Sequence, residues 1–320
     1  MAADLSRDDL EYTSCPLCGL NDLEKEFTSK DFLFSWREFS VVRCRSCGLL
    51  FTNPRVRENY ISTYYFPDYA PYKDVKQSTF IQKAKSILGK IPGDIHLRIL
   101  ETLKSFNAKD VLEIGPANGS LLFFLREHGF EVTGVEIDRN CAEKIRGKGI
   151  PCLQGDLNEN MREMGQKRFD AVILCHVLEH LYRPKETLKN IYNLLNEQGI
   201  IYLTLPNSGS FEARIFGKYW LGFDLPRHVV HYDMETIGAV LSETGFHIDK
   251  LEDVPDPSFI IQSMAYCFFK KGKMPGKLYY LLYYPLKLLG PLFYVRIIGS
   301  SVMSIVAGKI KRANKDAHRR

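Results

Sequence analysis

Short apolar runs alternate with longer amphipathic segments through the middle of the chain. Five of these runs predict strands: Val111–Ile114, Phe130–Ile137, Pro151–Asp156 (a strand and its turn), Phe169–Cys175 and Gly199–Thr204. Three segments with helical spacing lie before or between them: Asp94–Phe106, Leu121–Glu127 and Leu188–Leu195. Strands that alternate with helices are typical of parallel βαβ units. The pattern therefore predicts an α/β fold built on a parallel sheet.

The C-terminal third extends this pattern. Three further elements are predicted there: helix Met234–Thr244, strand Phe246–Leu251 and a last strand, Ser301–Ala307. The apolar, Tyr-rich residues 255–300 are predicted to form a helical insertion before that last strand. Leu278–Val295 is nearly long enough to span a bilayer, but three residues argue against a transmembrane helix: Pro285, Lys287 and Pro291.

Charge is unevenly distributed along the 320 residues. Residues 270–320 hold 12 Lys or Arg and one acid, a charge of +11, so residues 1–269 carry −6 of the net +5. Two interpretations of this basic end stay open: a helical cap with a solvated tail, or contact with an anionic membrane surface through residues 270–320. The N-terminus lacks a charged-then-apolar leader, so we expect a cytoplasmic protein, with membrane contact, if any, at the inner surface.

Two Cys-x-x-Cys-Gly motifs stand near the N-terminus. Cys15, Cys18, Cys44 and Cys47 have the spacing of a four-cysteine zinc ribbon, and four thiolates leave no open position for water. We therefore expect a structural zinc ion that supplies on the order of 10 kcal/mol of folding free energy. The alternative is a ribbon that binds nucleic acid. Residues 1–54 hold 6 basic and 9 acidic residues, which disfavours contact with phosphates.

The predicted organisation has five parts: a zinc-ribbon module over 1–54, a connector or lid over 55–93, a core over 94–254, the helical insertion over 255–300, and the last strand with a basic tail over 301–320. Within the segment 55–93, the prolines Pro67 and Pro71 are interleaved with Tyr60, Tyr64, Tyr65, Phe66, Tyr69 and Tyr72. A connector and a tyrosine-lined lid are equally compatible with this composition.

A glycine turn follows the first strand of the predicted core. Gly115 and Gly119 are four residues apart, which permits a tight turn and the close approach of a ligand. Ala117 occupies the place of the middle glycine of a dinucleotide-binding motif, which disfavours a dehydrogenase. Glu113, just before the turn, would repel phosphate. This strand end therefore suits a cationic ligand.

An acid follows the second strand at the distance at which nucleotide-binding folds hold ribose hydroxyls. Glu136 is the candidate for that role, and Asp138 is predicted to be the N-cap of the next helix. Together with Glu113 and the glycine turn, these residues resemble the motifs of class I S-adenosylmethionine-dependent methyltransferases. The resemblance implies a Rossmann-like seven-stranded sheet. It also implies cofactor contacts by three further residues: Asp156 at the adenine amino group, the backbone of Leu157 beside it, and Cys175 at the end of the fourth strand.

Residues 176–180 match the zinc-protease pattern H-x-x-E-H, but they leave a central strand and meet Pro184 soon afterwards, so we reject a protease site. They are similar instead to the segment after strand four in ubiquinone-type and related small-molecule methyltransferases. Some of these relatives hold a divalent cation with the residues that match Glu179 and His180. His176 stands where they have a further acid, and a structural role for Glu179 and His180 is an equal alternative.

The segment from Pro206 to Tyr232 is too long and too aromatic for a simple connection, and it leaves the same edge of the sheet as the cofactor turns. We expect it to form the wall of the acceptor site. His228 and His231 are the candidate general bases for deprotonating a hydroxyl. The alternative is that both histidines hold the loop by hydrogen bonds.

Nearly the whole chain resembles the zinc-ribbon-bearing class I methyltransferases associated with sugar, polysaccharide and secondary-metabolite pathways. The expected function is therefore methyl transfer from S-adenosylmethionine to a small-molecule hydroxyl, with no nucleic-acid partner. Two alternatives stay open: an RNA methyltransferase that grips its target with the ribbon, and a non-catalytic S-adenosylmethionine-binding protein.

Overall fold

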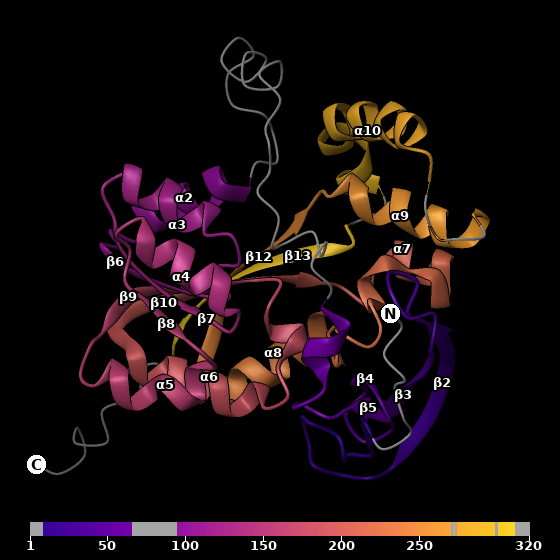
Figure 1. Ribbon diagram of the computed structural model, residues 1–320, viewed down its shortest axis with the longest axis horizontal. Coiled ribbons are helices and arrows are strands. Elements are labelled where there is room, and N and C mark those ends of the chain that lie inside the picture. The colour runs from indigo at the N-terminus through magenta and orange to yellow at the C-terminus, as the bar shows by residue number, and fades with distance from the viewer. Residues whose placement is uncertain (1–8, 66–94, 270–271, 273, 298–299, 311–320) are drawn as a thin grey trace, which may run out of the picture.

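A seven-stranded sheet forms the centre of the structure, in the order β12-β13-β10-β9-β6-β7-β8 (Figure 1). The computed structural model describes residues 9–65, 95–269, 272, 274–297 and 300–310, with side chains over the same residues except 287–297. The strands are β6 (Asp110–Ile114), β7 (Glu131–Glu136), β8 (Cys152–Gln154), β9 (Phe169–Cys175), β10 (Leu195–Pro206), β12 (Phe246–Val254) and β13 (Val302–Lys309). Strands β6 to β10 are parallel, whereas β13 is antiparallel to both of its neighbours. The expected α/β fold and seven-stranded sheet are confirmed.

Two layers of helices cover the sheet because successive residues of its strands face opposite sides. In the buried strand β6, Val111 packs with one layer and Leu112 with the other. The first layer is α2 (Ile95–Ser105), α3 (Ser120–Glu127) and α4 (Arg139–Gly147); the second is α5 (Leu157–Met164), α6 (Pro184–Leu194) and α8 (Met234–Glu243) (Figure 1). These strands are buried on both faces, which explains why they read as continuous apolar runs in the sequence.

The order of the strands places a ligand site at the carboxyl end of β6. From β6 the chain adds β7 and β8 on one side, and then crosses to add β9 on the other side. The loops after β6 and β9 therefore diverge and leave a crevice, which is where open α/β sheets bind ligands.

A second sheet joins the N-terminal module to the core. Its order is β11-β4-β3-β2, from β2 (Leu23–Lys30), β3 (Glu38–Cys44), β4 (Leu50–Thr52) and β11 (Val230–His231). Strand β11 comes from the far end of the expected acceptor wall and pairs with β4. A separate short pair, β1 (Leu10–Glu11) and β5 (Arg55–Val56), lies beside this sheet. The pairing of β11 with β4 was not foreseen from the sequence, and the limits of the five predicted parts stay predictions.

Two helices lie between β12 and β13, where the sequence predicted a helical insertion. They are α9 (Pro257–Phe268) and α10 (Gly276–Ile297), with α10 stacked on the outer side of α9 (Figure 1). The short elements α7 (Phe211–Phe216), η5 (Gly217–Tyr219) and η6 (Leu221–Phe223) pack beneath α9. Within the described residues, no helix is both apolar enough and long enough to cross a membrane. The residues Phe66, Tyr69 and Tyr72 of the predicted lid, and the tail 311–320, lie outside the described residues.

Candidate functional site

A cavity of about 1160 Å³ opens at the carboxyl ends of β6 and β9. Its floor is formed by the loops after β6, β7, β8 and β9. Leu33 of the N-terminal module contributes to its wall, as do Ile61 and Tyr65 of the segment 55–93, Phe259 of α9 and Tyr279 of α10. All the predicted cofactor-binding residues line this cavity except Gly119.

The glycine turn after β6 depends on backbone geometry that only glycine adopts readily. Gly115 and Gly119 have φ angles of +69° and +78°. A Cβ atom at Gly115 would lie 2.7 Å from Val177 Cγ2, and one at Gly119 would lie 2.8 Å from Ile145 Cγ1. Gly115 therefore shapes the cavity itself, whereas Gly119 allows α3 to pack against its neighbours.

Glu136 is held at the end of β7 by two backbone N–H groups. Its side chain is buried, and it accepts hydrogen bonds from Ala117 N at 2.7 Å and from Asp138 N at 2.8 Å. Burial raises the pKa of Glu136, and these backbone N–H groups act in the opposite direction. Asp138 is the N-cap of α4, as predicted, and its side chain accepts from Cys141 N. The Glu136 carboxylate is thus oriented in advance at the edge of the cavity.

Glu113 is also buried, but it has fewer hydrogen-bond partners than Glu136. Its side chain is 4% exposed, and Oε2 has no hydrogen-bond partner among the described residues. Burial and the nearby charge of Glu136 raise the pKa of Glu113 to about 8. An unpartnered buried carboxyl beside a cavity favours a cationic ligand, which would supply the missing partner.

The other predicted contacts lie at the ends of β8 and β9. Asp156 accepts a hydrogen bond from Asn158 N at 2.8 Å as the N-cap of α5, whose first residue is Leu157. Cys175 ends β9, and burial raises the pKa of its thiol to about 12. The thiol is therefore neutral near pH 7 and acts as a wall of the cavity rather than as a nucleophile.

His228 lines the cavity, and a hydrogen bond fixes the orientation of its ring. Its Nδ1 lies 2.8 Å from the carbonyl oxygen of Gly222, and because a carbonyl only accepts, Nδ1 carries the proton. The lone pair of Nε2 is then available to a ligand. Nε2 lies 4.0 Å from Glu179 Oε1 and 4.0 Å from Asp224 Oδ2, so a proton gained by the ring would meet two carboxylates.

Glu179 and His180 lie beside this ring. Burial alone would raise the pKa of Glu179, but the hydrogen bond from His176 and the charges of the surrounding histidines lower it to about 2. Burial and the charge of His228 lower the pKa of His180 to about 4. His180 Nδ1 lies 2.9 Å from the carbonyl oxygen of Arg227, which leaves its Nε2 unprotonated.

This cluster could hold a cation. One ligating atom each of Glu179, His180 and His228 lies within 4.8 Å of the others, and both imidazoles are anchored through Nδ1 in the way that is typical of metal ligands. His176 is outside this group and donates to Glu179 across 3.3 Å. A lone pair of His228 that binds a cation cannot also accept a proton, so a cation site and a general base are mutually exclusive uses of that atom.

His231 does not reach the cavity. It is not among the described residues of the lining, because β11 turns its side chain toward the N-terminal sheet, where Nε2 lies 3.2 Å from Thr52 Oγ1 and the ring packs on Phe223. Burial lowers the pKa of His231 to about 3, so the ring is neutral. Of the two histidines predicted as bases, the structure therefore brings only His228 to the site.

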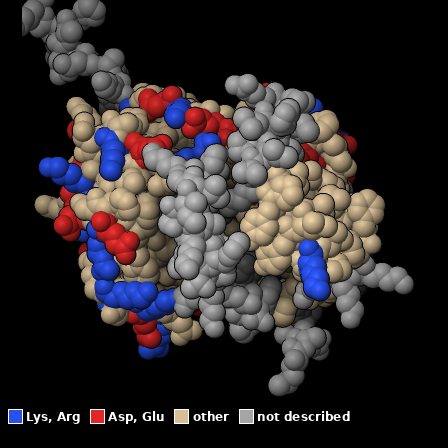
Figure 2. All heavy atoms as spheres, turned by 90° about the horizontal axis from the view of Figure 1, so that it is seen from above, with Lys and Arg blue, Asp and Glu red and all other residues tan. Residues whose placement is uncertain are grey.

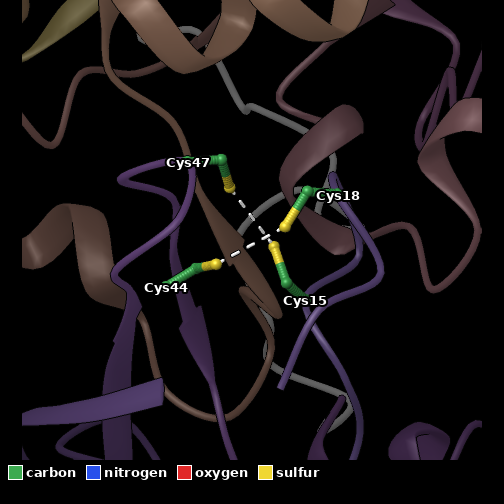
Figure 3. Close-up of side chains that lie close together, drawn as sticks. All are labelled: Cys15, Cys18, Cys44 and Cys47. Carbon is green, nitrogen blue, oxygen red and sulfur yellow. Dashed lines mark hydrogen bonds between the residues drawn. The ribbon is translucent and has the colours of Figure 1, made fainter. Parts of the chain in front are cut away.

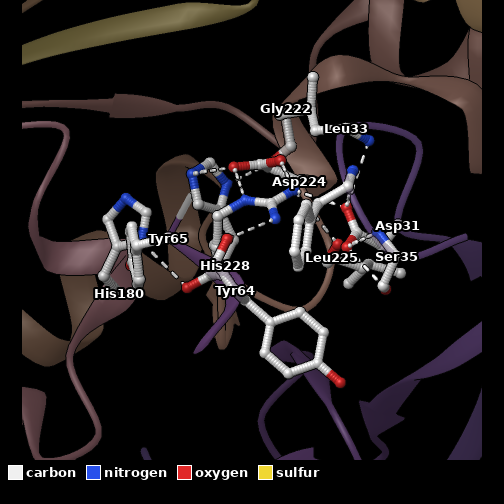
Figure 4. A network of polar contacts seen from close by, with 12 residues as sticks. Asp31, Leu33, Ser35, Tyr64, Tyr65, His180, Gly222, Asp224, Leu225 and His228 are labelled. Carbon is white, nitrogen blue, oxygen red and sulfur yellow. Dashed lines mark hydrogen bonds and ion pairs between the residues drawn. The ribbon is translucent and has the colours of Figure 1, made fainter. Parts of the chain in front are cut away.

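A buried ionic network supports His228 and was not found from the sequence (Figure 4). Arg227 Nη2 lies 2.9 Å from Asp31 Oδ1 and 2.6 Å from Asp224 Oδ1, and Arg227 Nη1 donates to the Tyr64 carbonyl. The carboxylates raise the pKa of Arg227, and the guanidinium lowers that of Asp224, both against the effect of burial. Arg227 stood in the sequence next to His228, but nothing local linked it to Asp31.

The four N-terminal cysteines face one another (Figure 3). The Sγ atoms of Cys15 and Cys47 are 3.5 Å apart, as are those of Cys18 and Cys44, and all four lie within 4.8 Å of one another. Disulfides are excluded, because an S–S bond measures about 2.05 Å. A tetrahedral ion with bonds of about 2.3 Å to sulfur separates its ligands by about 3.8 Å. The donor set and its spacing therefore fit zinc.

A model of a known family matches the chain. It is described as "Methyltransferase domain" and covers residues 86–251, which is more than half of the sequence. That range contains the glycine turn, Glu136, Asp156, Cys175 and His228.

Curated proteins and solved structures agree with this match. The chain is 24% identical over 154 residues to the ubiquinone biosynthesis O-methyltransferase of Coxiella burnetii, covering 46% of this chain and 64% of that protein. It is 33% identical over 101 residues to a putative methyltransferase of Geobacillus sp., covering 29% of this chain and 41% of that protein. The chain thus spans less than two thirds of the length of these relatives.

A crystal structure of the plantazolicin methyltransferase BamL, in complex with a triazolic desmethylPZN analog and SAH, superposes with a TM-score of 0.50 at 13% identity. The match covers 78% of this chain and 94% of BamL. At this identity the similarity shows the fold alone.

Proposed function

The chain belongs to the methyltransferase domain family, and on that premise we propose that it transfers a methyl group from S-adenosylmethionine to a hydroxyl of a small-molecule acceptor. A sugar, a polysaccharide precursor or another metabolite is the expected acceptor. The observation that carries the proposal is a single cavity whose lining includes Glu113, Glu136 and His228.

The floor of the cavity fits the cofactor. Glu113 offers an unpartnered buried acceptor to a cationic group, and Glu136 offers a fixed carboxylate to paired ribose hydroxyls. Asp156 and Leu157 would border the adenine, with Cys175 near the reacting end. When bound, S-adenosylmethionine supplies an electrophilic methyl group on a sulfonium.

His228 is the proposed general base. The Gly222 carbonyl fixes its tautomer, so the proton that the acceptor hydroxyl loses passes to Nε2. Glu179 and Asp224 face the imidazolium that results, each at 4.0 Å, and stabilise its charge. The acceptor would lie between this ring and the apolar wall of Ile61 and Phe259. Beyond this proton transfer, the protein has to hold the acceptor oxygen, the methyl group and the sulfur in line.

The test of the methyltransferase proposal supplies the protein with radiolabelled S-adenosylmethionine and a crude cell extract, and then separates the products by phase. Label in a small metabolite supports the proposal, whether it partitions into the aqueous or the organic phase. Label in RNA would favour the alternative of a ribbon that grips nucleic acid. Cofactor binding without label in any product would favour a non-catalytic protein.

Repeating the assay after dialysis against a chelator, with and without added magnesium, tests the role of Nε2. A rate that needs no divalent cation supports the general base. A rate that returns only with the cation assigns Glu179, His180 and His228 to a metal instead. The four N-terminal cysteines would retain their ion under mild chelation, which metal analysis of the dialysed protein verifies.

We also propose that the four N-terminal cysteines bind a structural zinc ion. Four sulfur ligands complete a tetrahedron and leave no position for a substrate. Metal analysis of the protein, purified without chelators, should give one zinc ion per chain. Protein purified in this way that contains no zinc would contradict the proposal.

A further inference from the structure

The outer face of helix α10 is apolar where it meets water. Among its described side chains, three large residues of one face are well exposed: Tyr280 at 57%, Leu281 at 69% and Tyr284 at 49%. Leu278, at the edge of that face, is 37% exposed. Among the residues of α10 whose side chains are described, Lys277 is the only charged one. Helices on the surface of globular proteins normally present polar residues there.

The other side of α10 accounts for its contacts with the protein. Tyr279 lies on that side and lines the cavity, and Leu282 and Leu286 are half-buried. The helix is thus apolar on both sides, although packing on α9 requires only one. Phe268, the last residue of α9, adds a ring that is 76% exposed. Figure 2, which views the molecule from the side of α10, shows a broad area of residues other than Lys, Arg, Asp and Glu over this part of the surface, with basic but no acidic side chains on it.

The charge of this part of the chain identifies what would cover the exposed face. Residues 257–300, which include α9 and α10, contain no Asp or Glu and six Lys or Arg. A second copy of the chain would bring two such cationic regions together, which electrostatic repulsion opposes. Anionic lipid headgroups would neutralise the cations, while tyrosine rings are favoured at the level of the headgroups.

We propose that Leu278, Tyr280, Leu281 and Tyr284 of α10, with Phe268 of α9, dock on the surface of a bilayer that contains anionic lipids. The helix lies in the plane of the surface and inserts these side chains among the headgroups. The cavity lies on the opposite side of α10, behind Tyr279, so docking leaves the site unobstructed. The proposal does not depend on which reaction the cavity performs.

Sedimentation with lipid vesicles tests the docking. The full chain should bind vesicles of equimolar phosphatidylcholine and phosphatidylglycerol, bind pure phosphatidylcholine more weakly, and lose affinity as salt rises. The double variant Tyr280→Ser/Leu281→Ser should bind the mixed vesicles about tenfold or more weakly, because two inserted side chains are lost. The matched control is Tyr12→Ser/Leu20→Ser, which alters one exposed tyrosine and one exposed leucine of the N-terminal module.

Absence of binding, or equal binding by both double variants, would refute the proposal. A dimer that forms without lipid and is lost in the α10 variant would also refute it, and would assign the face to a second copy. Hydrogen exchange of the unmodified protein provides an independent check, because mixed vesicles should slow exchange in α10 and leave the N-terminal sheet unchanged.

Discussion

The guanidinium of Arg227 and the carboxylate of Asp31 form an ion pair of 2.9 Å in which both side chains are fully buried. Asp31 lies in the turn between β2 and β3, and its carboxylate also accepts from the backbone N–H of Ser35. Arg227 precedes His228 and holds Asp224, whose carboxylate faces the same ring. The N-terminal module is therefore joined to the proposed base through one continuous network.

Asp31→Asn should weaken both the fold and the rate. The substitution removes one of the two carboxylates that neutralise the buried guanidinium of Arg227. We therefore expect the free energy of unfolding to fall by about 3 kcal/mol. The kcat should fall more than the affinity for cofactor, because Asp31 pairs with Arg227 next to His228, whereas it is not among the described residues that line the cavity with Glu136. Denaturant unfolding and steady-state kinetics measure the two effects. Glu26→Gln is the control, because its pair with Arg43 is partly exposed and contributes less than about 1 kcal/mol.

His228→Ala should lower kcat by about 10²–10⁴-fold, the usual contribution of a general base. The dissociation constant for S-adenosylmethionine should change little, because the proposed cofactor contacts lie elsewhere in the cavity. His128→Ala, in an exposed residue after α3, serves as the control and should keep the full rate. An unaffected kcat in His228→Ala would remove this histidine from the mechanism.

Glu136→Ala should weaken binding of S-adenosylmethionine by about tenfold or more, the scale of a lost hydrogen bond to a charged group. The lost carboxylate also frees Ala117 N–H and loosens the glycine turn. Titration calorimetry measures the affinity directly. Glu131→Ala, an exposed residue at the start of the same strand, should bind normally. Wild-type affinity in Glu136→Ala would contradict the ribose assignment.

Binding of S-adenosylmethionine should strengthen as pH rises toward 8. The pKa of Glu113 is raised to about 8 in the free protein, so below that pH the carboxyl holds a proton that a cationic ligand must displace. Affinity should rise by up to about tenfold per pH unit below 8 and level off above it. Calorimetry in buffers of different ionisation enthalpy should detect the released proton, and Glu113→Gln should release less.

The same pKa fixes how Glu113 affects stability. A carboxyl whose pKa is raised by folding stabilises the protein fully below its unfolded pKa of about 4.3, and that contribution is lost as pH rises through about 8. Glu113→Gln should therefore raise the melting temperature of the ligand-free protein at pH 9 and have little effect at pH 4. A melting temperature that falls at pH 9 would contradict the burial of an unpartnered carboxylate.

Removal of zinc should unfold residues 13–54, since the ion is expected to contribute on the order of 10 kcal/mol to so small a module. Because β4 pairs with β11, the loss should reach the segment that carries His228. Strong chelation should therefore abolish methyl transfer and expose the amides of β2 to β4 to hydrogen exchange. Cys47→Ser should likewise lower methyl transfer and increase hydrogen exchange in β2 to β4. Cys267→Ser, which alters an exposed free cysteine, should change neither. An unchanged melting profile after chelation would refute the four-thiolate site.

Many features of this protein can be predicted from the sequence because they depend on patterns of neighbouring residues. Buried parallel strands read as apolar runs, a left-handed turn requires glycine at Gly115, and paired Cys-x-x-Cys motifs specify their own chemistry. The family resemblance added Asp156 and Cys175 at the ends of their strands. Each of these inferences depends on residues only a few positions apart, or on the rule that parallel strands end at one edge of a sheet.

Tertiary structure alone decided which histidine meets the cavity and what supports it. His228 and His231 are three residues apart and chemically alike, and only the pairing of β11 with β4 turns His231 away. Asp31 reaches Arg227 across 196 positions, a contact that no local pattern encodes. The exposed face of α10 is another feature that only the tertiary structure reveals. An apolar helix in sequence is ambiguous between core and surface, and only the packing of α9 against one side of it shows which residues remain in water.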